Sequence, residues 1–241
     1  MGSAVILRSV GKSFGTKTVV ADLSFSVERG ECFGLMGPNG AGKSTTLKMI
    51  YGFIRPTSGT ILVDGSDVVL APRETRSKLG IAPQEDLLDT DLNVSQNLHF
   101  HARYHGFPAA EARRRCASVL RETRLEDHAR DPVSHLSTGL RRRLILGRAL
   151  LNDPAIVILD EPTRGLDRES RLQYLGTLKM LKSRGTTLLL ATHDLAEAEA
   201  LCDRAAIMER GRIRVEGSLG EILQACNNEQ PSPIEAEEVA C

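Results

Sequence analysis

The sequence predicts an α/β fold with a mostly parallel sheet. Residues 155–159 and 186–192 are continuous apolar runs, as expected for strands of a parallel sheet that is covered on both faces. A third apolar run, residues 32–36, leads into a glycine-rich loop and then into a helical pattern over residues 42–50. With 241 residues, the chain is long enough for one large domain with a buried core.

The N-terminal part reads as strands joined by turns. Val5 and Leu7 open an alternating apolar pattern, and Gly15 indicates a turn. Residues 23–27 continue the strand pattern, and residues 55–65 read as a further turn and strand. We therefore expect an antiparallel β portion in the N-terminal part of the domain.

Helical and polar segments fill the rest of the chain. Residues 91–130 are rich in His, Arg, Ala and Leu and contain few β-branched residues, which favours helices. A further helix is expected over about residues 168–184, ended by Gly185. The last segment, residues 227–241, is acidic and contains two prolines, so we expect a disordered tail there. The folded domain is then expected to span residues 1–226.

Composition excludes several classes of protein. The chain has 31 basic and 31 acidic residues, and this balance disfavours a general nucleic-acid partner. No apolar run approaches the roughly 18 residues of a membrane-spanning helix, and the N-terminus lacks the pattern of a signal peptide. The five cysteines do not have the spacing of metal ligands. We expect a cytoplasmic chain with reduced thiols that reaches a membrane only through a partner.

Residues 37–45 have the spacing of a phosphate-binding loop, G-x4-G-K-S, between an apolar strand and a helix. Its glycines let successive backbone N–H groups face phosphates, and the helix N-terminus adds the positive end of its dipole. Lys43 would reach the β- and γ-phosphates, and the Ser44 hydroxyl could bind Mg²⁺. The expected nucleotide-binding residues of this loop are Gly37, Pro38, Asn39, Gly40, Ala41, Gly42, Lys43, Ser44 and Thr45.

Asp160 and Glu161 close one apolar run, and His193 closes the next. The carboxyl ends of parallel strands are where such sheets bind ligands, so we expect these side chains at one edge. Asp160 would hold Mg²⁺ through its water shell, and Glu161 would orient and deprotonate an attacking water. His193 could reach the γ-phosphate. A solvated acidic pair and a structural histidine are the alternative interpretations.

Four further features could have a purely structural role. Residues 137–139 could present N–H groups and a hydroxyl to a phosphate, or they could simply cap a helix. The arginines at 141–143 could suggest nucleic acid, but adjacent positions spread around a helix, which favours solvated or ion-paired side chains. His101 and His105 could share a helix face, without a third ligand for a metal. Residues 194–197 predict a helix cap with no chemistry.

In order and spacing, these motifs resemble the ATP-binding cassette family over about residues 5–225. The phosphate loop reads GPNGAGKST, and Gln84, in IAPQED, matches the family's glutamine loop. LSTGL at 136–140 is similar to the signature motif, usually LSGGQ. ILDEPTRGLD at 158–167 is similar to the second nucleotide motif followed by the D-loop. The resemblance also matches His193 to the switch histidine, Asp167 to the D-loop aspartate, and Phe14 to an aromatic residue that stacks on adenine.

The resemblance implies a P-loop NTPase with a RecA-like core and a helical subdomain inserted at about residues 84–148. It implies ATP and Mg²⁺ as cofactors, with Gln84 among the catalytic and metal-binding residues. It also implies a head-to-tail dimer with a second copy or a homologue, in which Ser137 and Gly139 of one chain complete the partner's ATP site. The implied activity is ATP hydrolysis that powers transport through a separate membrane permease, with the chain on the inner face of the membrane.

Two departures from the family pattern bear on the type of transporter. Thr138 replaces the usual first glycine of the signature, and Leu140 replaces the usual glutamine. An apolar residue there, followed by several arginines, is similar to ATPases of drug and polysaccharide exporters, including the nodulation-factor and daunorubicin types. This similarity favours export over import.

Two other function classes compete with a transporter ATPase. A soluble cassette protein that acts on ribosomes or DNA is disfavoured, because the chain has one cassette, no net charge, and no room for long coiled coils between Lys43 and Glu161. A different P-loop class, such as a nucleotide kinase, would leave LSTGL, Asp167 and His193 without an explanation.

Overall fold

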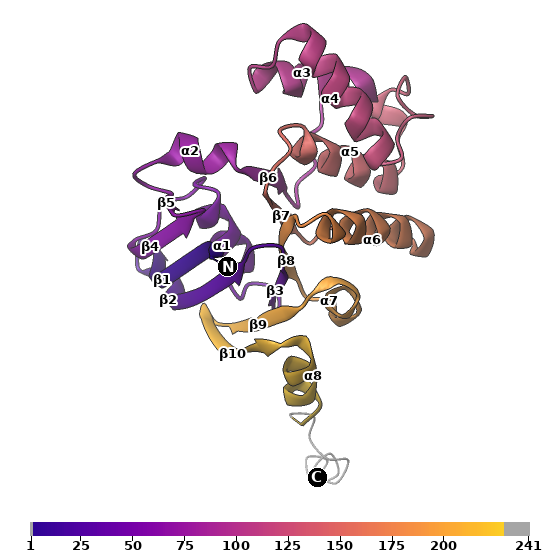
Figure 1. Ribbon diagram of the computed structural model, residues 1–241. Helices are drawn as coiled ribbons and strands as arrows, with labels where there is room; N and C mark the ends of the chain where they lie inside the picture. Colours follow the sequence, from indigo (N-terminus) through magenta and orange to yellow (C-terminus); the bar gives the residue numbers. More distant parts are fainter. Residues whose placement is uncertain (1, 229–241) are drawn as a thin grey trace.

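Two β-sheets organise the chain in the computed structural model, which describes residues 2–228 (Figure 1). The four-stranded antiparallel sheet has the order β2-β1-β4-β5 and comprises β1 (Ser3–Phe14), β2 (Lys17–Glu28), β4 (Ser58–Val63) and β5 (Ser66–Asp67). The six-stranded sheet has the order β10-β9-β3-β8-β7-β6 and comprises β3 (Cys32–Met36), β6 (Leu79–Ala82), β7 (Ile156–Asp160), β8 (Thr187–Thr192), β9 (Arg204–Glu209) and β10 (Arg212–Ser218).

The six-stranded sheet is parallel except at one edge. β6, β7, β8, β3 and β9 run parallel, and β10 pairs antiparallel with β9. Every residue of β3, β7 and β8 is buried, because both faces of the sheet are covered. The predicted α/β class, with a mostly parallel sheet and an N-terminal antiparallel portion, is confirmed.

Helices pack around the parallel sheet, and three of them form a separate layer at the top of Figure 1. That layer consists of α3 (Val94–Tyr104), α4 (Ala109–Glu122) and α5 (Thr138–Leu150). The 3-10 turn η1 (Val133–His135) precedes α5. The other helices are α1 (Lys43–Ile50), α2 (Pro72–Ser77), α6 (Arg168–Ser183), α7 (Leu195–Leu201) and α8 (Leu219–Asn228).

Element boundaries lie close to the expected ones. β7 and β8 begin one residue later than the apolar runs, and α6 ends one residue before the expected end of its helix. α8 continues to Asn228, so the first two residues of the predicted tail are helical. The rest of the predicted tail, residues 229–241, lies outside the described residues.

Apolar side chains form two clusters, one on each face of the parallel sheet. Val157 and Leu159 of β7 pack in one cluster together with residues of α3 to α6, such as Leu144. Ile156 and Ile158 of the same strand pack in the other cluster, with α1 and the antiparallel sheet. This alternation follows from the two-residue repeat of a strand. The carboxyl ends of the strands are thereby held between two cores.

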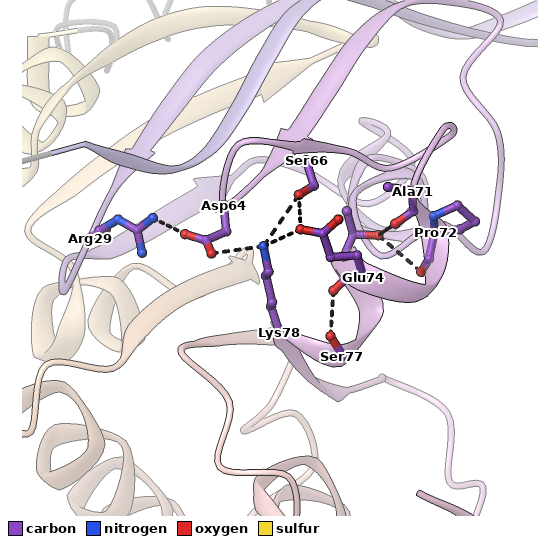
Figure 2. A network of polar contacts seen from close by, with 9 residues as sticks. Arg29, Asp64, Ser66, Ala71, Pro72, Glu74, Ser77 and Lys78 are labelled. Carbon is purple, nitrogen blue, oxygen red and sulfur yellow. Dashed lines mark hydrogen bonds and ion pairs between the residues drawn. The ribbon is translucent and has the colours of Figure 1, made fainter.

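A polar network ties α2 to the turn between β4 and β5 (Figure 2). Lys78, the residue after α2, lies 3.1 Å from Asp64 Oδ2 and 3.0 Å from Glu74 Oε1. Arg29 pairs with the other oxygen of Asp64, and the Ser66 hydroxyl donates to Glu74. The network joins the antiparallel sheet to the segment that leads into β6.

Within residues 2–228, no helix combines the length and the apolar character needed to cross a membrane.

Candidate functional site

The loop at residues 37–42 joins β3 to α1 at the carboxyl edge of the parallel sheet. Gly37 has φ 143°, and a Cβ there would lie 2.1 Å from Met208 O. Gly42 has φ 107°, and a Cβ there would lie 2.9 Å from Val19 O. Only glycine fits these positions, because both the left-handed backbone and the close neighbours exclude a side chain. The loop is therefore clamped between β9 and β2.

Lys43 begins α1 and is only 5% exposed. Its Nζ donates to Gly37 O at 2.6 Å and to Pro38 O at 3.2 Å, so two carbonyl groups of the loop bind the ammonium. Around it, Ala41 and Gly42 are buried, Ser44 and Thr45 are half-buried, and the exposed residues of the loop are Pro38, Asn39 and Gly40.

Asp160, the last residue of β7, lies beside the start of α1. The Ser44 hydroxyl donates to Asp160 Oδ1 at 3.1 Å. Burial raises the pKa of Asp160, and the Ser44 hydrogen bond and the charges of Lys48 and Lys43 oppose that rise. A hydroxyl and a carboxylate that meet in this way form a set of hard oxygen ligands that suits Mg²⁺.

Glu161 follows β7 in a left-handed conformation with φ 48°, which is unfavourable for a residue with a side chain. Its N–H donates to Ala191 O at 2.8 Å, which fixes the turn against the end of β8. Its carboxylate is buried, with Oε1 3.6 Å from Lys43 Nζ and Oε2 2.7 Å from His193 Nδ1. The turn thus aims the carboxylate between the lysine and the half-exposed imidazole.

Phe14 and Gln84 lie on segments next to this edge. Phe14 ends β1, pairs with Lys17 of β2, and has 49% of its surface exposed. The Lys12 ammonium lies over the Phe14 ring, 4.8 Å from the ring centroid. Gln84 is half-buried and follows β6, whose last residue pairs with the β7 residue before Asp160.

Residues 137–139 lie at the start of α5, in the helical layer. The Ser137 hydroxyl accepts from Leu140 N–H at 3.3 Å and caps the helix. Thr138 is exposed and helical, so threonine causes no backbone strain there. Gly139 is buried, and a Cβ at this position would lie 2.4 Å from Ser170 Oγ. Its lack of a side chain is therefore required by packing within the same chain.

Asp167 caps α6. Its carboxylate accepts from Ser170 N–H at 2.8 Å and from the Ser170 hydroxyl at 2.9 Å, and these bonds lower its pKa. The family resemblance matched this aspartate to the D-loop. In the structure its carboxylate caps the N-terminus of α6.

Comparison with known proteins places this arrangement in a family. Residues 20–164 match the model of the ABC transporter family. The chain belongs to the ABC transporter family. It is an ATP-binding subunit and an ATPase of that family.

Relatives and solved structures agree with this assignment. The chain is 45% identical to the Nod factor export ATP-binding protein I of Ralstonia nicotianae, over 92% of this chain and 70% of the relative. The corresponding protein of Paraburkholderia xenovorans is also 45% identical, over 99% and 75%. A solved ATP-binding subunit of an ABC transporter has TM-score 0.83 at 33% identity, covering 97% of both chains. A dimeric ATP-binding cassette bound to ADP and Pi has TM-score 0.81 at 28% identity, covering 89% of this chain and 98% of that one.

Within this ABC ATPase, contacts bring together only part of the expected site. One hydrogen bond joins Ser44 to Asp160, and two further contacts join Glu161 to Lys43 and to His193, so these five residues lie together. Across residues 2–228, no hydrogen bond joins this group to the other expected side chains, which are Phe14, Gln84, Ser137 and Asp167.

The sequence did not reveal that the side chain of Glu197 is buried in this ABC ATPase. Asp194 caps α7 as predicted and accepts from Glu197 N–H at 3.2 Å, but the Asp194 N–H donates to the Thr192 hydroxyl at 3.0 Å and not to the Glu197 carboxylate of a capping box. The Glu197 carboxylate is buried near Thr192 and Thr163, its Oε1 has no hydrogen-bond partner among the described residues, and the residue is 1% exposed. These threonines are neighbours of His193 and of the turn after Glu161. The only available signal was its spacing from the apolar residues Ala198 and Leu201 on the buried face of α7.

Proposed function

We propose that this chain powers export through a separate membrane permease, to which it binds at the inner face of the membrane. The names of its relatives support this proposal, because they are nodulation-factor export ATPases at 45% identity over nearly the whole chain. A solved neighbour, the cbiO1 protein of Clostridium perfringens, is part of the transporter complex cbiONQ and has TM-score 0.84 at 27% identity, covering 96% of this chain and 97% of that one.

The contacts at the sheet edge support a division of catalytic roles. Lys43 and the loop N–H groups bind the phosphates of ATP, and Glu161 acts as general base toward water. His193 holds Glu161 in place through their 2.7 Å contact. Ser44 and Asp160, with Gln84, hold Mg²⁺, which neutralises charge on the phosphates when it is bound. Phe14, at the exposed tip of its hairpin, stacks on the adenine.

The site also requires a second chain. We place Ser137 and Gly139 against the γ-phosphate of a partner in a head-to-tail dimer with a second copy or a homologue, with Asp167 at the same interface. Exposure at the start of α5 supports this proposal, because Ser137 and Thr138 face away from the core of their own chain. The ABC domain then spans residues 1–226, with a helical subdomain at residues 84–148.

The permease would dock where the helical layer meets the parallel sheet. A groove of about 300 Å³ lies there, lined by Pro83, Leu87, His101, His105, Arg148 and other residues. Leu87, which lines the groove, is 63% exposed and Tyr104 of α3 is 82% exposed, so both side chains are accessible to a partner. Glu85 and Asp86 pair with Lys48 and Arg141, so they stabilise the segment internally.

Export through a permease is tested by Leu87→Asp and Tyr104→Asp in the assembled transporter. We expect loss of permease binding in pull-down for both variants, with ATP hydrolysis by the isolated Tyr104→Asp subunit unchanged. Leu70→Asp is the matched control, because Leu70 is 84% exposed on the segment between β5 and α2. Normal permease binding by both variants would contradict this docking site.

A further inference from the structure

Three arginines of α5 bind one short segment that precedes α3. Arg141 Nη1 donates to Asp86 Oδ2 at 2.8 Å, Arg142 Nη1 to Pro83 O at 3.2 Å, and Arg148 Nη1 to Leu87 O at 2.6 Å. The partners are all in residues 83–87, which we call the Gln84 segment. The segment has no regular secondary structure, so its carbonyl groups need partners from elsewhere.

Arg148 holds the segment in a defined geometry. Its second terminal nitrogen, Nη2, contacts His101 Nε2 on α3. Burial, with a smaller effect of the Arg148 charge, lowers the pKa of His101 to about 4. The imidazole is therefore neutral near pH 7, and Nε2 can accept from the guanidinium. A planar guanidinium can serve a carbonyl and an imidazole at once, whereas a lysine presents a single point charge.

The Gln84 segment is also tied to the helix that follows the phosphate loop. Glu85 Oε1 lies 3.3 Å from Lys48 Nζ of α1. One side of the segment thus contacts α1, which begins at Lys43, and the other side contacts α5, which begins beside Ser137. α5 is held near its start by Arg141 and near its end by Arg148. The segment is thus bonded to α5 near both ends of the helix.

We propose that Arg141, Arg142 and Arg148 form a clamp that makes the Gln84 segment and α5 move together, so that the position of this segment sets the position of Ser137. The clamp residues are positioning residues, and the proposal rests on the two-chain ATP site proposed above. It also gives a role to Arg141, Arg142 and His101, for which the nucleotide site offers none.

The test is charge exchange across the pair formed by Arg141 and Asp86, measured in the full chain. ATP-driven dimerisation is followed by light scattering in a Glu161→Gln background, in which hydrolysis is slow. Arg141→Asp and Asp86→Arg should each raise the half-saturating ATP concentration about 3- to 10-fold, the scale of coupling between neighbouring groups. The double exchange should restore it to within about twofold of the parent, as expected for a direct pair.

Arg143→Ala is the matched control, because Arg143 lies on the same helix but donates to Arg124 O, outside the segment. Its half-saturating concentration should stay close to that of the parent. Hydrogen exchange at residues 138–142 should rise in the single exchanges and recover in the double exchange, and thermal unfolding verifies that each variant folds. Parent-like dimerisation by both single exchanges, or no recovery in the double, overturns the clamp. A parent that does not dimerise with ATP overturns the two-chain site and the clamp together.

Discussion

Glu161 combines a strained backbone with two charged or polar neighbours. Its φ of 48° is maintained by the N–H bond to Ala191 O, and its carboxylate lies between Lys43 and His193. Strain of this kind persists only where the surrounding structure fixes it, and it is common at active sites. The sequence predicted the residue but not this conformation, because the conformation depends on the neighbouring strand.

Replacing Glu161 by Gln should remove the general base and leave the shape of the site. Hydrolysis should fall about 10²- to 10⁴-fold, the usual scale for that role. ATP binding should persist, because Lys43 and the loop are unchanged. Steady-state phosphate release and nucleotide titration measure the two effects. Hydrolysis at the wild-type rate would exclude Glu161 as the base.

Glu197 should make stability depend on pH. Burial raises the pKa of its carboxyl above the ordinary value, against the opposing hydrogen bonds of Thr192 and Thr163. A carboxyl whose pKa is raised in the folded state favours folding at low pH, and this contribution is lost as the pH rises through the raised pKa. Glu197→Gln removes the buried charge, so it should raise the melting temperature at pH 8 more than at pH 5, by about 2–4 °C if the gain is ~1 kcal/mol. An equal change in melting temperature at both pH values would contradict the idea that burying the charged Glu197 carboxylate destabilises the fold.

β3, β7 and β8 could be predicted from sequence because every residue of these strands is buried, which makes each one a continuous apolar run. The runs that became β7 and β8 needed no knowledge of their neighbours. The contacts of Arg142 and Arg148 could not be predicted, because their acceptors are backbone carbonyls far away in the sequence. The requirement for glycine at 139 was also hidden, since Ser170 belongs to another helix.

The network around Lys78 should stabilise α2 and the β4–β5 turn modestly. Burial pushes the pKa of Asp64 up, but the hydrogen bonds and charges of Lys78 and Arg29 outweigh it and leave the pKa lowered. A carboxyl whose pKa is lowered in the folded state stabilises the fold at pH values above its ordinary pKa. This stabilisation is lost as the pH falls through the folded-state pKa. Lys78→Met should lower the melting temperature by no more than about 3 °C near pH 7, as for a partly exposed ion pair.

The effect of Lys78→Met should shrink below about pH 4, where the carboxyl groups take up protons. Arg210→Met is the control, because its pair with Glu209 is long at 4.0 Å and 92% of the arginine side chain is exposed. A melting temperature that falls equally at pH 7 and pH 3 would mean that Lys78 acts through packing rather than charge.

At the scale of the whole chain, each proposed ATP site is divided between two subunits. The phosphate loop, Asp160, Glu161 and His193 gather at the edge of the parallel sheet, whereas Ser137 and Gly139 lie at the start of α5 in the helical layer (Figure 1). The resemblance predicts both halves, but which chains supply the two halves of one site is a property of the assembly. The proposed function therefore depends most on whether two chains share a site.

Complementation between two inactive variants tests this claim most directly. Lys43→Ala disables the phosphate loop of a chain, and Ser137→Arg disables its signature. Each variant alone should hydrolyse ATP at least about 100-fold more slowly than the wild type. Mixed one to one, they should recover on the order of a quarter of wild-type activity, because half of randomly paired dimers are mixed and each mixed dimer contains one intact site. A mixture as inactive as its components, measured at concentrations at which the wild type is active, would contradict the two-chain site.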